Sequence, residues 1–143
     1  MAIPILSTLG VEGCPLPTAV LATHTLFPMF VLMDMTDELP KIIIHWEGLG
    51  LKFDAVYSGF LGSGRQAEIV ADCIASCLKD DALAVVDPVL GDNGSMEPTM
   101  DMGMVESMRM LVGKADCITP NLTEASLLLD EPYPFEAERS GMD

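Results

Sequence analysis

Apolar positions along the chain follow two spacings that alternate. Short continuous apolar runs predict strands at residues 53–57, 82–86 and 117–119. Each run is followed by a segment in which apolar residues recur every three or four positions, which predicts a helix. Successive strand–helix units favour a largely parallel sheet with right-handed crossovers and helices on its faces. The pattern therefore predicts an α/β fold.

Each predicted helix carries an apolar stripe. The helix before the first of these strands is expected to open at Thr36 as its N-cap, with Asp37 and Glu38 in the first turn. The last helix is expected at residues 122–130, after a possible capping box of Asn121 and Glu124. The stripes of the other helices are Leu39, Ile42, Ile43 and Trp46; Ile69, Val70, Cys73, Ile74, Cys77 and Leu78; and Met100, Met104, Val105, Met108, Leu111 and Val112.

The N-terminal part of the chain is less regular. Residues 2–9 predict a short helix that ends at Gly10, and residues 13–23 predict a strand that two prolines confine to irregular or edge pairing. Residues 24–35 are expected to form a loop. Residues 131–143, which contain two prolines, are expected to form a loosely ordered tail. No linker divides the chain, so we expect one domain.

Composition and charge exclude several classes of protein. Half of the 143 residues are hydrophobic, which allows a sizeable core. The chain has 7 Lys and Arg against 22 Asp and Glu, a net charge of −15, which repels nucleic-acid backbones. The longest apolar run, at residues 26–33, is far shorter than the roughly 20 residues that cross a membrane. The first residues lack the basic flank of a secretory leader, so we expect a cytoplasmic location.

The cysteines and methionines favour a core role. The four cysteines lie in apolar stretches and are expected to be free thiols. Cys73 and Cys77 share a helical face, but zinc prefers four ligands and the chain has two histidines, so buried side chains are the favoured interpretation. The Met-x-Met pattern at residues 100–110 is a possible Cu(I) site, although its helical spacing favours core packing.

Candidate chemistry lies in the loops that follow the strands, because ligands of open α/β sheets bind beyond the carboxyl ends of the strands. The first of these loops contains His24 and Thr25. The others read Ser-Gly-Phe-Leu-Gly-Ser at residues 58–63, Asp-Pro-Val-Leu-Gly-Asp-Asn-Gly at 87–94 and Thr-Pro-Asn-Leu-Thr-Glu at 119–124.

In this order the four loops resemble motifs of the pyridoxal/pyridoxamine kinase branch of the ribokinase-like superfamily. The resemblance runs from Ala2 to about Tyr133. Hydroxymethylpyrimidine kinases share the last two motifs, so the assignment to the pyridoxal kinase branch depends on the first two motifs. The resemblance implies a ribokinase-like three-layer α/β/α fold with a mostly parallel sheet. It also implies that residues 1–143 form a partial kinase domain, incomplete at both ends.

The resemblance further implies ATP-dependent phosphorylation of the 5′-hydroxymethyl group of pyridoxal, pyridoxamine or pyridoxine, with Mg²⁺ on the phosphates and a homodimer as the complete protein. Mg²⁺ prefers carboxylate and water ligands, which suits Asp87 and, through water, Glu124. The residues matched to the B6 vitamer are His24, Thr25, Leu26, Ser58 and Gly59. Those matched to the nucleotide are Asp87, Thr119, Asn121 and Glu124.

Other interpretations stay open. The family's G-x-G-D motif, whose aspartate is the general base, does not occur in this sequence, so the chain is expected to be inactive by itself. Leu26 stands where the family often has a small or polar residue. Asn121 and Glu124 would suffice as a helix cap, and Asp87 before Pro88 as a turn. The alternative functions are a non-catalytic nucleotide- or partner-binding module and a relative of the hydroxymethylpyrimidine kinases.

Overall fold

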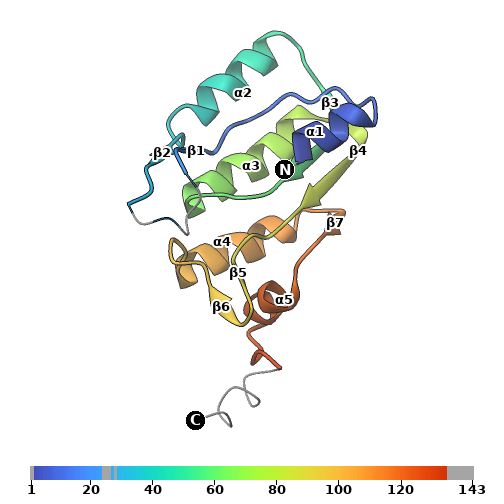
Figure 1. The fold of residues 1–143 in the computed structure, drawn as a ribbon. Helices are drawn as coiled ribbons and strands as arrows, with labels where there is room; N and C mark the ends of the chain where they lie inside the picture. The colour runs from blue at the N-terminus through green and yellow to red at the C-terminus, as the bar shows by residue number, and fades with distance from the viewer. Residues whose placement is uncertain (1, 24–26, 28, 135–143) are drawn as a thin grey trace, which may run out of the picture.

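A computed structural model describes residues 2–23, 27 and 29–134 (Figure 1). From residue 53 onward, a helix follows each strand of the parallel sheet before the next one begins, as the apolar pattern predicts. The elements are α1 (Ala2–Thr8), β1 (Ala19–Leu21), β2 (Leu32–Asp34), α2 (Leu39–Gly48), β3 (Phe53–Ser58), α3 (Gly64–Cys77), β4 (Leu78–Val86), β5 (Gly91–Asp92), β6 (Ser95–Met96), α4 (Met102–Val112), β7 (Cys117–Ile118) and α5 (Leu122–Leu129).

The sheet that organises the fold has the strand order β3-β4-β7, and both of its strand pairs are parallel. Two short antiparallel pairs, β1-β2 and β5-β6, lie outside it. The helices α2, α3 and α4 pack side by side (Figure 1). The main core lies between α3, α4 and the α3-facing side of β4. The expected α/β class with a parallel sheet is confirmed.

The methionine helix and the buried cysteines confirm the core interpretation. Met104 and Met108 belong to the main core, and both are buried. Cys73 and Cys77 are buried in a second cluster between α2 and α3, whereas Cys14 is exposed. The cysteines are free thiols, as expected.

Three local expectations are wrong at the ends of elements. Residues 32–34, expected in a loop, form β2. Thr36 is not the N-cap of α2, because its backbone N–H donates to Asp34 Oδ1 (2.7 Å) and its hydroxyl accepts from a side chain of α3. The helix instead begins after Glu38. Leu78 is not helical, since its extended backbone begins β4.

The sheet is not covered evenly on its two faces. Val86 is fully buried against α3 and α4, whereas Leu83 is 48% exposed. In the strand register, Tyr57 lies opposite Val85, and Val85 shares a face with Leu83 because strand side chains alternate. Tyr57 is 49% exposed on that same face. The helices that the sequence predicts on the faces of the sheet therefore leave this face of β3 and β4 partly uncovered among the described residues.

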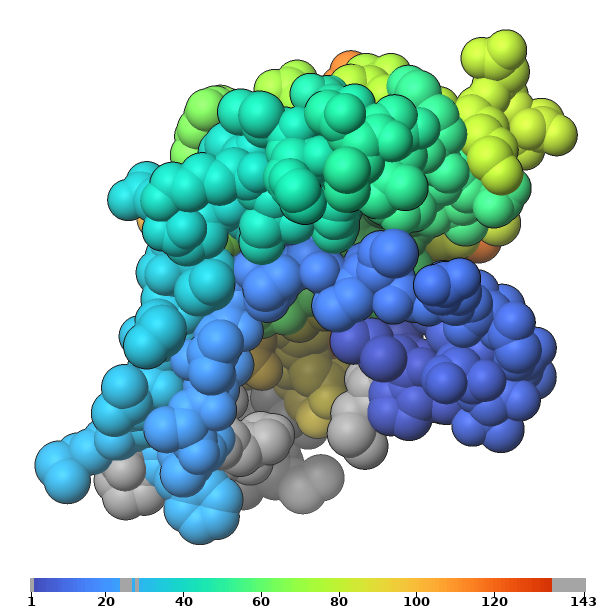
Figure 2. Space-filling model, turned by 90° about the horizontal axis from the view of Figure 1, so that it is seen from above, coloured from blue at the N-terminus to red at the C-terminus, as the bar shows by residue number. Residues whose placement is uncertain are grey.

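Figure 2 shows the surface hollowed between α1, in dark blue, and the β1–β2 pair, in paler blue, with yellow chain near residue 90 at the floor of the hollow. Within the described ranges, no helix combines the length and apolarity needed to cross a bilayer. His24, Thr25, Leu26 and residues 135–143 of the expected tail lie outside the described residues.

Candidate functional site

The loops after β3, β4 and β7 meet at one edge of the sheet. The three strands are parallel neighbours, so their carboxyl ends point the same way. The Asp87 N–H donates to the Ser58 carbonyl (2.8 Å), and the Thr119 N–H donates to the Val86 carbonyl (3.1 Å). The structure therefore brings together the described residues that the sequence pointed to after each strand.

Glu124 links two of these loops. It lies in the first turn of α5, where Asn121 Oδ1 accepts from the Glu124 N–H (2.9 Å) and Glu124 Oε2 accepts from the Asn121 N–H (2.8 Å). This reciprocal pair is the expected capping box. Glu124 Oε1 also accepts from the Leu90 N–H (3.3 Å), and Asn121 Nδ2 donates to the Gly91 carbonyl (2.8 Å). The cap thus fixes α5 against the loop after β4.

The environment of Glu124 disfavours its charged form. The side chain is buried, with 5% of its surface exposed, and this burial raises the pKa of its carboxyl group. Backbone hydrogen bonds from Asn121 and Leu90 oppose the shift, and the nearby charge of Asp87 adds to it. The two carboxylates are therefore close enough to repel each other, and a cation between them would offset that repulsion.

These carboxylates fit a magnesium ion that phosphates also bind. The Glu124 carboxylate accepts hydrogen bonds from backbone N–H groups, and its two oxygens together have about four lone-pair sites, so it can still face a cation. In the described part of the chain, no group of three or more His, Cys, Asp or Glu side chains could hold a metal by itself. Mg²⁺ commonly uses one or two carboxylates and completes its shell with water and phosphate oxygens. Asp87 and Glu124 match that pattern.

Ser58 offers an unused polar atom beside this edge. Its side chain is 6% exposed, and within the described residues its hydroxyl is the buried side-chain polar atom without a hydrogen-bond partner. Such an atom costs free energy unless it finds a partner. A side chain added at Gly59 would meet only the Tyr57 ring, at 3.9 Å, so the backbone there is open to a close approach.

Gln66 positions the loop that carries Ser58, and the sequence analysis missed it. Its side chain is fully buried. Its Nε2 donates to the Thr18 carbonyl (2.8 Å) and to the Thr36 hydroxyl (2.9 Å), and its Oε1 accepts from the Gly62 N–H (2.8 Å). The Thr18 hydroxyl donates to the Phe60 carbonyl (2.8 Å). The signal for Gln66 in the sequence was a polar residue beside the apolar stripe of α3.

Tyr57 is the second residue that the sequence analysis missed. Its hydroxyl donates to Asp87 Oδ2 (3.0 Å) across the β3–β4 pair. Burial raises the pKa of the Tyr57 phenol, and the Asp87 carboxylate adds to this shift. The phenol therefore acts as a hydrogen-bond donor at neutral pH. Thr119, in contrast, is exposed.

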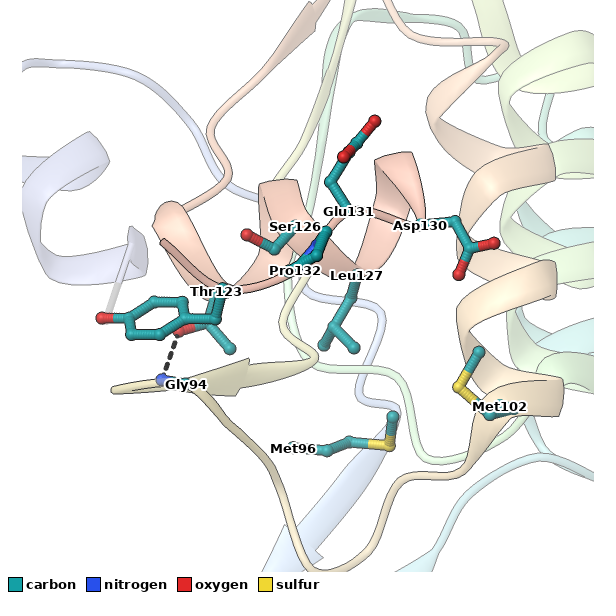
Figure 3. Close-up of a pocket in the computed structure, with 10 residues that line it drawn as sticks. Gly94, Met96, Met102, Thr123, Ser126, Leu127, Asp130, Glu131 and Pro132 are labelled. Atoms are coloured by element: carbon teal, nitrogen blue, oxygen red, sulfur yellow. Dashed lines mark hydrogen bonds between the residues drawn. The ribbon is translucent and has the colours of Figure 1, made fainter. Parts of the chain in front are cut away.

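A cavity of about 340 Å³ lies next to this site, beside α5 and the β5–β6 pair (Figure 3). Met96, Met102 and Leu127 line it, and Figure 3 shows Leu127 pointing toward Met96 while the Glu131 side chain points away. Thr123 stands at its margin, where its hydroxyl accepts from the Gly94 N–H (2.9 Å). Gly94 and Thr123 come from two of the loops that the sequence pointed to, but none of the described residues matched to the vitamer, the nucleotide or the metal lines this cavity. The candidate site is instead an open edge of the sheet.

The sequence matches a protein family over almost its whole length. The match covers residues 3–140, and the family is that of phosphomethylpyrimidine kinase. The pyridoxal kinase PdxY of Burkholderia lata is 30% identical over 138 residues, which are 91% of this chain and 47% of that protein. The PdxY of Pasteurella multocida is 31% identical over 125 residues, 81% of this chain and 42% of that protein.

Solved structures agree with these matches. A Bacteroides thetaiotaomicron protein named for phosphomethylpyrimidine kinase is 54% identical, with a TM-score of 0.90 over 98% of this chain and 49% of that chain, and one of its crystal forms contained pyridoxal. Pyridoxal kinase from Lactobacillus plantarum is 36% identical, with a TM-score of 0.85 over 92% of this chain and 47% of that chain. The chain spans less than half the length of the curated relatives it matches.

Proposed function

Because this chain belongs to the phosphomethylpyrimidine kinase family, we propose that it forms part of an ATP-dependent kinase that phosphorylates the 5′-hydroxymethyl group of a B6 vitamer. The observation that carries the proposal is the meeting of Ser58, Asp87, Asn121 and Glu124 at the carboxyl edge of one parallel sheet. The likeness to pyridoxal kinases over most of this chain supports the choice of substrate.

In this proposal each residue has a role in positioning. Asp87 and Glu124 hold a magnesium ion on the phosphates of ATP, Glu124 through water, and Thr119 and Asn121 face the nucleotide. The ion neutralises phosphate charge during transfer. Ser58 and Gly59 receive the vitamer, since the Ser58 hydroxyl lacks a partner and the Gly59 backbone is open. His24, Thr25 and Leu26 are assigned to the vitamer as well, by resemblance alone.

The second candidate substrate is a hydroxymethylpyrimidine. It is favoured by the name of the matched family and by the name of the Bacteroides protein. The crystal form of that protein with pyridoxal and the Lactobacillus pyridoxal kinase favour the vitamer. Both substrates present a hydroxymethyl group on a heteroaromatic ring, so a direct comparison of the two decides between them.

The test joins this chain to the remaining half of the Bacteroides protein, which is 54% identical in the shared part. With ATP and Mg²⁺, the joined protein should convert pyridoxal to pyridoxal phosphate faster than it phosphorylates hydroxymethylpyrimidine. Asp87→Ala should abolish the activity. A preference for the pyrimidine would establish the second candidate. Full activity of the Asp87→Ala protein would show that the site has been misplaced.

The 143-residue chain by itself should not form pyridoxal phosphate, because its sequence has no G-x-G-D segment to supply the general base. General-base assistance typically contributes about 10²–10⁴-fold to a rate. Nucleotide binding without transfer would suit this chain and equally a non-catalytic module, so the joined protein is the decisive measurement. Product from the unjoined chain, lost in Asp87→Ala, would contradict the prediction. We also propose that the complete kinase is a cytoplasmic homodimer.

A further inference from the structure

Tyr57 reaches from β3 to the end of β4. The register places Tyr57 opposite Val85, so its side chain shares the face from which Asp87 projects two residues later. Its hydroxyl donates to Asp87 Oδ2 (3.0 Å). The ring is 49% exposed, so this residue contributes less to the core than to the contact at its tip.

The backbone of Asp87 is held on both sides. Its N–H donates to the Ser58 carbonyl (2.8 Å), and its carbonyl accepts from the Val89 N–H (2.9 Å). With the backbone in place, the side-chain torsions decide where the carboxylate points. The Tyr57 hydroxyl restrains those torsions by engaging Oδ2, and it leaves Oδ1 to a second ligand.

We propose that Tyr57 is a positioning residue that orients the Asp87 carboxylate toward a magnesium ion on the nucleotide phosphates. The inference rests on the proposed function, because it assigns Asp87 to that ion. A hydrogen bond to a metal-binding carboxylate limits its rotation and lowers the entropy that binding must remove. Loss of such outer contacts typically weakens metal affinity about 10- to 100-fold.

The test uses the full 143-residue chain and ADP as the probe. Calorimetry measures ADP affinity across a Mg²⁺ titration and again with chelator. Tyr57→Phe keeps the ring and removes the hydroxyl, so it should raise the Mg²⁺ concentration at half-effect about tenfold. Affinity for ADP in chelator should not change.

Asp87→Asn separates this inference from the proposed function. If Asp87→Asn raises the Mg²⁺ midpoint and Tyr57→Phe does not, the role of Tyr57 is refuted and the assignment of Asp87 stands. If neither variant moves the midpoint, the role of Tyr57 and the assignment of Asp87 to the ion both fail. If the unchanged chain binds no ADP with Mg²⁺, the inference fails for this chain, and the joined protein still decides the proposed function. Crystal structures add a readout that needs no nucleotide: Asp87 should hold one carboxylate orientation in the native chain and several in Tyr57→Phe. If the Asp87 carboxylate holds the same single orientation in both crystal structures, the inference is wrong.

Discussion

Glu124 combines a structural and a proposed chemical role in one carboxylate. Its hydrogen bonds with Asn121 cap α5, and its contact with the Leu90 N–H reaches the loop after β4. A helix cap alone requires neither the hydrogen bond from the Leu90 N–H nor the proximity of the Asp87 carboxylate. Both features follow if the carboxylate also holds a cation at this edge of the sheet.

Replacement of Glu124 by Gln should separate these roles in the joined kinase described above. The change keeps the shape and removes the charge, so turnover should fall on the order of 10²-fold, the lower range for losing one preorganised electrostatic contact. Stability should change by about 1 kcal/mol or less, because Gln also serves at this position of a capping box. Turnover across a Mg²⁺ titration, with a melting curve, measures both.

Glu131→Gln is the control, since it removes the same charge from an exposed position past the end of α5. It should leave turnover and Mg²⁺ dependence unchanged. Unchanged turnover in Glu124→Gln would show that Glu124 is a cap without a metal role.

The raised pKa of Glu124 also predicts how stability depends on pH. Folded Glu124 binds its proton more tightly than the unfolded chain does, because burial disfavours the carboxylate. Stability from this group is therefore fully present below the unfolded pKa, about 4.3, and is lost as pH rises through the folded pKa. Glu124→Gln lacks this loss, so its stability relative to the native chain should improve between about pH 4 and neutrality. Denaturant titrations at several pH values measure the free energy of unfolding of both proteins. If the stability of Glu124→Gln relative to the native chain falls as pH rises, the prediction is wrong.

Contacts within one turn of helix could be predicted at the residue scale, and contacts between loops could not. Asn121 and Glu124 are three positions apart, so helix geometry alone brings them together. The Tyr57–Asp87 hydrogen bond spans 30 positions, and the bond from Gln66 to Thr18 spans 48. These pairings depend on strand register and on the path of the N-terminal segment, neither of which an apolar pattern specifies.

At the scale of elements, Gln66 joins three segments: its own helix α3, the loop after β3, and the chain around β1 and β2. Gln66→Leu fills a similar volume but removes the hydrogen bonds from Gln66 to Thr18, Thr36 and Gly62, which are half-buried. The Thr18 carbonyl keeps the Met35 N–H as a donor, whereas the Gly62 N–H loses the partner it has in Gln66. We therefore expect a loss of about 1–3 kcal/mol. Denaturant unfolding measures this loss.

The neighbouring Arg65→Gln is the matched control for Gln66→Leu. It breaks only the exposed ion pair with Glu68, so it should change stability by less than about 0.5 kcal/mol. Equal effects of the two substitutions would mean that Gln66 does not join these segments.

The end of α5 offers a stabilising substitution. Asp130 adopts a left-handed backbone (φ 58°, ψ 39°) at the helix C-cap, and its negative charge opposes the helix dipole. Arg109 meets the same helix end favourably, donating to the Leu127 and Leu128 carbonyls (2.8 Å each). Asp130→Gly should remove both the strain of the left-handed backbone and the unfavourable charge at the helix end, and so stabilise the chain by about 1 kcal/mol. Asp130→Asn removes only the charge and should gain a few tenths by comparison. No gain in a melting curve from either variant would contradict this account.

The elements with long apolar stripes were predictable, and the misplaced ones show what competes with periodicity. α3 and α4 follow their stripes because one face of each is buried in the core. β2 was missed because three residues paired with one short strand leave almost no periodic signal. The N-cap of α2 was misplaced because the hydroxyl of Thr36 bonds to Gln66 instead of to its own helix.

At the scale of the whole molecule, an acidic chain is proposed to bind an anionic nucleotide. The chain carries a net charge of −15. Within the described residues, the hydrogen bonds that reach Asp87 and Glu124 side chains come from Tyr57 and backbone N–H groups, with no Lys or Arg. In the proposed function, a cation on the phosphates would therefore offset their repulsion from these carboxylates, and Mg²⁺ dependence tests this together with turnover.

The uncovered face of the sheet predicts self-association of the 143-residue chain. Tyr57 and Leu83 are about half exposed on this face, and β3 and β7 are the outer strands of the sheet among the described residues. Exposed apolar strands with free edges are templates for pairing between chains.

The net charge of −15 opposes this association, so added salt should strengthen it by shortening the Debye length from about 30 Å at 0.01 M to about 10 Å at 0.1 M. Leu83→Lys places a charge on the same face and should reduce association at every salt concentration. Size-exclusion chromatography with light scattering measures the mass as concentration and salt increase. If the chain stays a monodisperse monomer with a sharp melting transition under all of these conditions, the prediction is wrong. The half-exposed side chains on this face of the sheet then do not drive association between chains.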